Sequence, residues 1–209
     1  MKLNRKLLPP VFSSDEAIFH LRDQYKAPAK ALLALEKAGE VLRLRRGLYA
    51  FAEDFDPLLA ASRVYGPSYI SYETALSYYG LIPEKVRQVI SVVDGRPARY
   101  SGQQIRYIYH SQNRPLFSLG MGMIFIGDHP LPFAIPEKAV LDTLDHHKLA
   151  TVSLSDNDIL DFVCEGLRIE FEELSKLSLK KMNPMAKMYR NLAPIKLVKA
   201  LKQRKERAS

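Results

Sequence analysis

The hydrophobic pattern changes its period at Gly39, and this change constrains the fold of the N-terminal part more than any other feature. Before Gly39, four apolar residues recur at the spacing of one helix face: Ala31, Leu32, Leu35 and Ala38. After it, the segment LRLRRGLYAF (42–51) has the alternation of two strands joined by a tight turn. The sequence therefore predicts a helix followed directly by a hairpin, with Gly47 in the turn.

Another helix is predicted upstream. Ser13 and Glu16 have the spacing of a capping box, which predicts a short helix to about Arg22, and Pro28 suits the first turn of the next helix. Three lysines share one side of that next helix: Lys26, Lys30 and Lys37. A helix, a basic helix and a basic hairpin, in this order, are typical of a winged helix-turn-helix, whose second helix enters the major groove of DNA.

The predicted DNA contacts are of two kinds. Phosphate and minor-groove contacts are expected from these three lysines and from the hairpin arginines Arg43, Arg45 and Arg46. Base contacts are expected near the start of the basic helix, from the short side chains of Ala27 and Ala29 together with Lys30. The alternative is a solvated hairpin whose charges only keep an edge strand soluble.

Downstream of residue 54, helical and alternating patterns intersperse. The expected helices span 57–65, 71–80, 136–147, 155–166 and 172–179, with a further helical region from 183 that Pro194 divides. The expected strands span 86–93, 104–110, 120–126 and 131–135. We therefore predict an α/β (α+β) protein with a winged helix-turn-helix domain over 1–54 and a mixed domain with a basic helical tail over 55–209.

Positive charge gathers at both ends of the chain. The net charge is +8. Residues 1–52 carry 10 Lys and Arg against 5 Asp and Glu, and residues 174–209 carry 11 against 1. Residues 151–173 carry 1 against 7, so an acidic patch precedes the basic tail. This asymmetry favours a polyanionic partner, and nucleic acid before membrane.

The apolar segments are short. The longest uncharged apolar run, 119–127, is far below the roughly 18 residues of a membrane span, and the first residues have no apolar run of signal-peptide length. We therefore expect a cytoplasmic protein with no membrane partner. The single cysteine, Cys164, is expected to be a small core residue.

No catalytic, metal or cofactor site is expected. Lys138 and Asp142 are four residues apart on the predicted helix and can pair, while the adjacent His146 and His147 point about 100° apart and rarely chelate together. Ser71 is interpreted as a helix cap rather than a nucleophile. A Walker-type glycine loop and a nucleotidyltransferase motif are both absent from the sequence, which argues against an enzyme.

Two further groups of residues leave alternatives open. Tyrosines at 69, 72, 78 and 79 either form a stacking platform for bases or, as is commoner at helical spacing, pack in a core. In the tail, one apolar helix face is predicted from Met185, Met188, Leu192 and Ile195. The tail also carries the basic residues Lys196, Lys199, Lys202 and Arg204. They either contact nucleic acid or an acidic partner, or form a solvated face of the helix.

Three phrases in the chain resemble the AbiEi family of bacterial antitoxins and transcriptional regulators. They are EKAGEVLRLRRGLYAF (36–51), SYISYETALSYYGLIPE (68–84) and IPEKAVLDTLDHH (135–147), and their order and spacing carry the resemblance across about 15–149. The resemblance implies an N-terminal winged helix-turn-helix that binds inverted repeats in its own promoter. It also implies a C-terminal domain that counters a nucleotidyltransferase-like toxin encoded beside it. The wing arginines are then expected DNA contacts, whereas Ser71, Glu137 and Asp142 lie in motifs of unassigned role.

Residues and resemblance together predict a DNA-binding antitoxin and transcriptional autorepressor of a toxin-antitoxin operon. The alternatives are a stand-alone winged-helix regulator without a toxin and an RNA-binding or RNA-processing protein.

Overall fold

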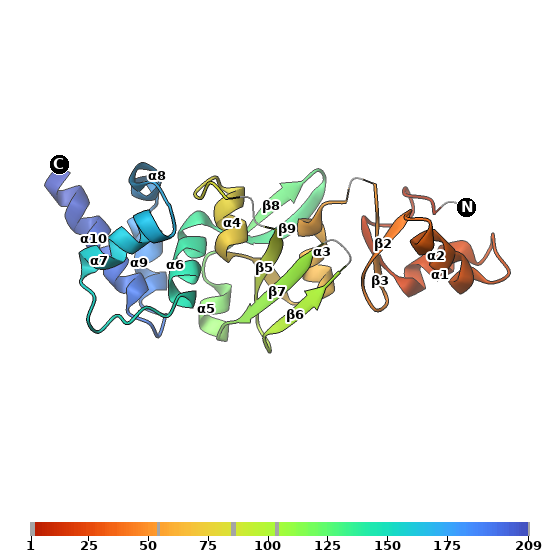
Figure 1. Cartoon of the computed structure of the whole chain (residues 1–209), viewed down its shortest axis with the longest axis horizontal. Coiled ribbons are helices and arrows are strands. Elements are labelled where there is room, and N and C mark those ends of the chain that lie inside the picture. The colour runs from red at the N-terminus through yellow and green to blue at the C-terminus, as the bar shows by residue number, and fades with distance from the viewer. Residues whose placement is uncertain (1–2, 54, 85–86, 103–104, 209) are drawn as a thin grey trace.

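The computed structural model describes residues 3–53, 55–84, 87–102 and 105–208 and shows a mixed α/β protein with two sheets (Figure 1). The N-terminal unit (residues 3–53) contains two helices and a three-stranded antiparallel sheet of order β1-β3-β2. Its elements are β1 (Val11–Ser13), α1 (Ser14–Leu21), α2 (Pro28–Lys37), β2 (Val41–Arg45) and β3 (Leu48–Phe51).

Local signals account for the limits of these elements. The capping box of α1 is confirmed, because the Glu16 amide donates to Ser13 Oγ at 3.1 Å and the Ser13 amide donates to the Glu16 carboxylate at 2.6 Å. Pro28 begins α2, and Gly39 and Gly47 adopt the positive φ angles of 74° and 76° that the following turns require. The strand β1 was not predicted, because its three residues become a strand only by pairing with β3.

The larger sheet has six strands in the order β6-β7-β5-β4-β9-β8. The strands are β4 (Ser68–Ile70), β5 (Gln88–Val93), β6 (Ala98–Ser101), β7 (Arg106–Ser111), β8 (Met121–Ile126) and β9 (His129–Ala134). The accompanying helices are α3 (Pro57–Val64), α4 (Tyr72–Tyr78), α5 (Arg114–Ser118) and α6 (Pro136–His146). The short elements β4, β6 and α5 were not predicted, and the expected strand starts at Val86 and Gln104 lie outside the described residues.

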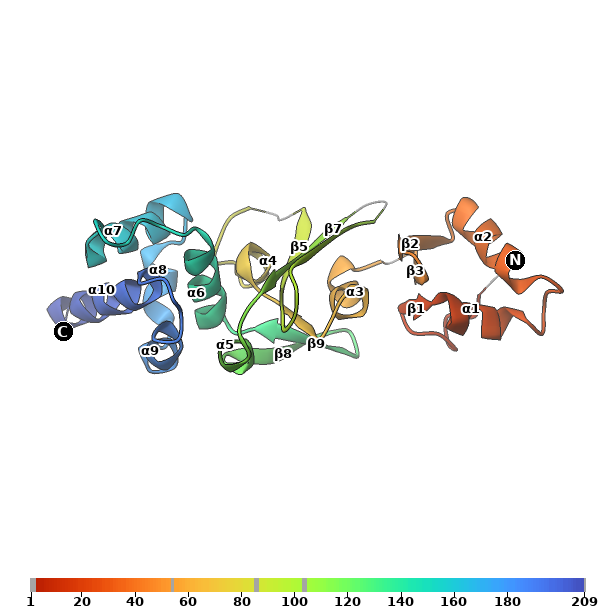
Figure 2. The same ribbon diagram turned by 90° about the horizontal axis from the view of Figure 1, so that it is seen from below.

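The C-terminal helices lie at the opposite end of the molecule from the N-terminal unit (Figure 2). They are α7 (Asp156–Asp161), the π-helical turn η1 (Phe162–Gly166), α8 (Phe171–Lys176), α9 (Leu179–Ala186) and α10 (Ala193–Ala208). The expected helix start at residues 183–184 is wrong, because Pro184 lies inside α9, and Pro194 lies in the first turn of α10.

The predicted apolar face from Met185 to Ile195 is therefore not one helix face. The chain is not helical between Lys187 and Leu192, so Met188 and Leu192 lie in the connection and are exposed.

Apolar residues cover both faces of the N-terminal sheet. On one face, Phe12 and Tyr49 pack against Leu21 and Leu35 of the two helices. Leu44 and other residues of the opposite face join the core of the larger sheet, where α3 contacts both β1 and β2. Burial on both faces links the N-terminal unit to the rest of the chain. Among the described helices, none combines the length and apolar character needed to cross a membrane.

Candidate nucleic-acid interface

The exposed side of α2 is basic. Lys30 and Lys37 are two turns apart on this side, Lys26 lies just before the helix, and all three are exposed. Leu33, which lies between the two helical lysines, is 49% exposed. In the part of the chain that the structure describes, no carboxylate lies within ion-pair distance of these lysines. Their charges are therefore available to an external anion.

The start of α2 lacks a side-chain cap. Ala27 occupies the cap position without a side-chain hydrogen bond, and Pro28 follows it. Ala27 and Ala29 are both exposed. The free amides of a first helical turn attract anions such as phosphate, and small side chains let a ligand come close to them. The region where base contacts were predicted is thus accessible.

The hairpin arginines are exposed but do not all face α2. Arg43 is paired with Tyr49, whose ring packs toward the helices. Burial raises the pKa of Tyr49, with a further rise from Glu36 of α2, and Arg43 opposes both effects. Arg43 therefore lies on the same face of the hairpin as Tyr49, the face that packs against the helices.

Arg45 lies on the other side of the hairpin, toward the larger sheet. Burial raises the pKa of Tyr109 in β7, and the charge of Arg45 opposes this rise. Arg46 is exposed at the turn, where its carbonyl oxygen is 3.5 Å from Arg45 Nη1. The structure thus places Arg43 on the side of the hairpin that faces the helices and Arg45 on the side that faces the larger sheet.

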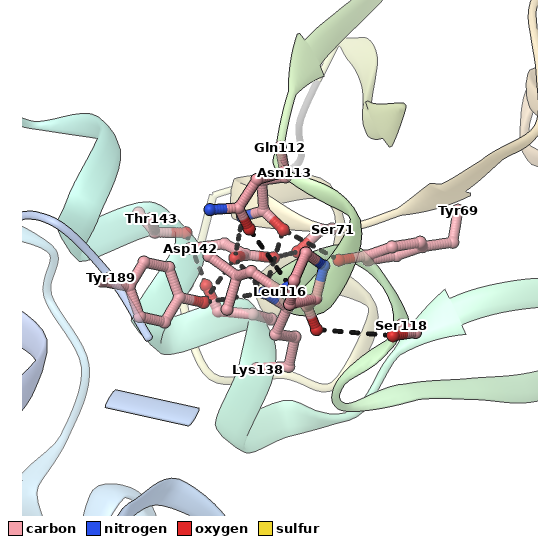
Figure 3. A network of polar contacts seen from close by, with 12 residues as sticks. Tyr69, Ser71, Gln112, Asn113, Leu116, Ser118, Lys138, Asp142, Thr143 and Tyr189 are labelled. Atoms are coloured by element: carbon pink, nitrogen blue, oxygen red, sulfur yellow. Dashed lines mark hydrogen bonds and ion pairs between the residues drawn. The ribbon is translucent and has the colours of Figure 1, made fainter. Parts of the chain in front are cut away.

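A buried polar network centres on Asp142 of α6 (Figure 3). Its Oδ1 atom accepts hydrogen bonds from Lys138 Nζ at 2.8 Å, Tyr189 OH at 2.5 Å and Gln112 Nε2 at 2.5 Å. Its Oδ2 atom accepts a hydrogen bond from Ser71 Oγ at 2.6 Å. The predicted pairing of Lys138 with Asp142 is confirmed, and both side chains are completely buried.

The ammonium group of Lys138 uses all three of its donors. Besides Asp142, it donates to Gln112 Oε1 at 3.0 Å and to Tyr189 OH at 2.9 Å. Burial lowers the pKa of Lys138, and the adjacent carboxylate of Asp142 opposes this effect. The network joins the ends of β4 and β7, the helix α6 and the connection between α9 and α10, so its evident role is to hold these segments together.

Ser71 is at the cap position of α4, as predicted, but its side chain does not cap the helix. Its hydroxyl donates to Asp142 instead. The neighbouring Glu137 carboxylate accepts a bond from the Ser178 amide at 3.2 Å and lies 3.6 Å from Lys181. The motif residues of unassigned role thus contact each other or the C-terminal helices.

Sequence reasoning missed Gln112 and Tyr189. Gln112 follows the end of β7, and Tyr189 follows α9 in a non-helical connection. Neither position has a local motif. Their part in the network is visible only in the tertiary fold, which brings their side chains to the buried Lys138–Asp142 pair.

The tyrosines mostly pack in the core. Tyr69 and Tyr72 are buried, Tyr79 is half-buried, and the more exposed Tyr78 packs against Phe133 with ring centroids 4.9 Å apart. Burial raises the pKa of Tyr69 and Tyr72, with Asp142 adding to the effect. The alternative of core packing is therefore favoured over a stacking platform.

Two histidines from distant segments pack against each other beside Tyr72. The rings of His110 in β7 and His146 in α6 are 4.2 Å apart, and Tyr72 packs against both. Burial, His146 and Arg99 lower the pKa of His110 to about 4. Among the described residues, no group of three or more His, Cys, Asp and Glu side chains is arranged to hold a metal ion.

The basic residues of α10 differ in their contacts. Lys196 Nζ donates to the carbonyl oxygens of Thr151 and Leu154, which ties α10 to the connection between α6 and α7. Lys202 lies 3.7 Å from Glu206, and Arg204 lies over the ring of Phe171. Lys199 is exposed. These residues lie far from α2, at the other end of the molecule (Figure 1).

In comparisons with known proteins, neither a protein-family model nor a curated protein matches the chain.

Proposed function

We propose that the protein is a DNA-binding antitoxin that represses its own operon. Residues 1–54 form a winged helix-turn-helix that binds an inverted repeat in the promoter, with α2 in the major groove. Residues 55–209 counter a nucleotidyltransferase-like toxin encoded beside the gene.

One observation carries the DNA-binding part of the proposal. The exposed side of α2 presents Lys26, Lys30 and Lys37, next to an uncapped helix start, and no carboxylate of the described residues lies within ion-pair distance of them. Phosphate contacts of this kind supply most of the affinity of proteins for DNA, and an exposed apolar residue such as Leu33 suits the methyl group of thymine. The antitoxin part is supported by the resemblance of three sequence segments to the AbiEi family.

The decisive experiment measures binding of the full chain to a labelled fragment of its own upstream DNA. With about six phosphates neutralised, log affinity should fall against log salt with a slope of about −5. Protection of an inverted repeat that survives random-sequence competitor supports autorepression. A slope near zero contradicts the proposal.

Lys30→Ala and Lys37→Ala should each weaken binding and make the salt slope shallower by about 1, because each removes one phosphate contact. The matched control is Lys180→Ala, since Lys180 is an exposed lysine on α9, at the other end of the molecule. Equal losses in all three variants would show that general positive charge, and not α2, binds the DNA.

The antitoxin activity is tested by co-expression with the neighbouring gene. Growth arrest by a nucleotidyltransferase-like neighbour, relieved by this protein, is the expected result. If no such gene is adjacent, the stand-alone regulator is favoured, and metal-dependent turnover of RNA by the purified protein would favour the RNA-processing alternative.

A further inference from the structure

Strand β8 is the end strand of the larger sheet and leaves one edge open (Figure 1). In the described part of the chain, its strand partner is β9 alone. The Gly120 carbonyl accepts a bond from the Ile135 amide at 2.9 Å, so every second residue from Gly120 bonds toward β9. The backbone groups of Met121, Met123 and Phe125 therefore point to the open edge.

The same three residues present apolar side chains to solvent. Met121, Met123 and Phe125 are 46%, 57% and 66% exposed. Their partners across the β8–β9 pair are Ala134, Pro132 and Pro130, so the neighbouring strand continues the apolar face. Exposed apolar patches of a few hundred Å² on a single chain commonly mark interaction sites.

The opposite edge of the sheet is built differently. Strand β6 is shorter, carries the exposed Arg99 and contacts β2 of the N-terminal unit. Charges, short length and covering segments are the usual protection of edge strands against pairing with other chains. Strand β8 has six residues without a charge or a proline, MGMIFI, and so lacks this protection.

The charge distribution favours a second copy as the occupant. The net charge of +8 repels identical chains from each other over most of their surface. Residues 115–136, which include both β8 and β9, contain no Lys or Arg. This segment therefore brings no cation of its own to a contact between two copies.

We propose that β8 pairs antiparallel with β8 of a second copy, across a two-fold axis at Met123. In this register Met123 faces its own counterpart and Met121 faces Phe125 of the partner, with all their backbone groups bonded. The exposed side chains of both copies then lie on one face, where sulfur and aromatic ring contact each other. The inference is independent of DNA binding, although a two-fold dimer suits an inverted repeat.

The size of the contact sets the expected strength. From their exposed fractions, the three side chains present about 300 Å² of surface per copy. Two copies with their strand edges then bury less than the roughly 1,200–2,000 Å² of stable complexes. The dimer should therefore be weak, and its population should rise with protein concentration.

The test is sedimentation of the full chain over a concentration series, up to the highest that stays in solution. The wild-type protein should shift from the mass of one chain to that of two. Met123→Lys should remain a single chain throughout, because two lysines would meet at the axis. Val152→Lys is the matched control, since Val152 is an exposed apolar residue (96%) away from β8 and acquires the same charge.

A charge exchange tests the register. Met123→Glu alone should be a single chain, whereas its mixture with Met123→Lys should form a mixed pair. Circular dichroism establishes that each variant is folded. A wild-type protein that remains a single chain at every concentration, or Met123→Lys that associates like the wild type, overturns the proposal. A mixture that does not associate overturns the register.

Discussion

Asp142 accepts hydrogen bonds from four side chains that are widely separated in the sequence. The completely buried pair with Lys138 has no solvent to stabilise either charge, so each depends on the other and on its hydrogen bonds. Gln112 and Tyr189 each bond to both members of the pair. Substitution of Asp142 should therefore destabilise the protein, although this residue lies far from the proposed DNA contacts.

Asp142→Asn should lower the free energy of unfolding by about 3–5 kcal/mol, because it preserves shape but leaves the ammonium of Lys138 buried without a counter-charge. Urea denaturation measures the loss. Thr143→Val is the control, because Thr143 is the next residue of α6 and is also buried. Its hydroxyl donates to the Ala139 carbonyl within the helix, so its removal should cost about 1 kcal/mol. Equal losses in the two variants would contradict a special role for the pair.

At the scale of elements, the turn before β8 depends on a glycine. Gly120 has a φ angle of +71°, which side chains rarely adopt. A Cβ atom at this position would lie 2.6 Å from Met185 Sδ and 2.8 Å from Lys138 Cβ. The turn thus lets β8 begin directly against α6 and α9.

Gly120→Ala should lower the free energy of unfolding by about 2–4 kcal/mol, because the added Cβ strains the backbone and also overlaps Met185 and Lys138. The comparison is Gly127→Ala at the other end of β8, where φ is +56° and an added Cβ would have no neighbour within 4 Å. It should cost about 1 kcal/mol, from strain alone. Thermal unfolding of both variants checks the difference, and a Gly127→Ala loss as large as that of Gly120→Ala would refute the overlap.

Elements with a local signal could be predicted from the sequence, and the others could not. The capping box of Ser13 and the prolines at 28 and 136 mark helix starts that the structure confirms. Strands β1 and β4 have three residues each, and only their neighbours make them strands. The Lys138–Asp142 pair follows from helix spacing, whereas the bond from Ser71 depends on a fold that brings residues 71 positions apart into contact.

At the scale of the whole molecule, the two basic regions lie at opposite ends (Figure 2). The N-terminal unit carries the lysines of α2, and α10 carries the basic tail. The larger sheet and α6 lie between them. A short DNA site bound by α2 would therefore not extend to α10.

The double variant Lys199→Gln, Lys202→Gln should change the affinity for a short operator fragment by less than about twofold. Charges that lie farther from the DNA than the Debye length of roughly 10 Å are screened by salt and contribute little to binding. Fluorescence anisotropy at about 0.1 M salt measures the effect. A loss comparable to that of Lys30→Ala would mean that the tail contacts the DNA directly.

The buried network also has a consequence for synthesis of the chain. Ser71, Gln112, Lys138 and Asp142 leave the ribosome well before Tyr189, whose hydroxyl bonds to both members of the ion pair. Domains generally complete folding only when all their segments have emerged. A nascent chain paused between Asp142 and Tyr189 therefore holds an exposed pair of charges and an unfinished core, and becomes protected from proteolysis only when its last helices are released.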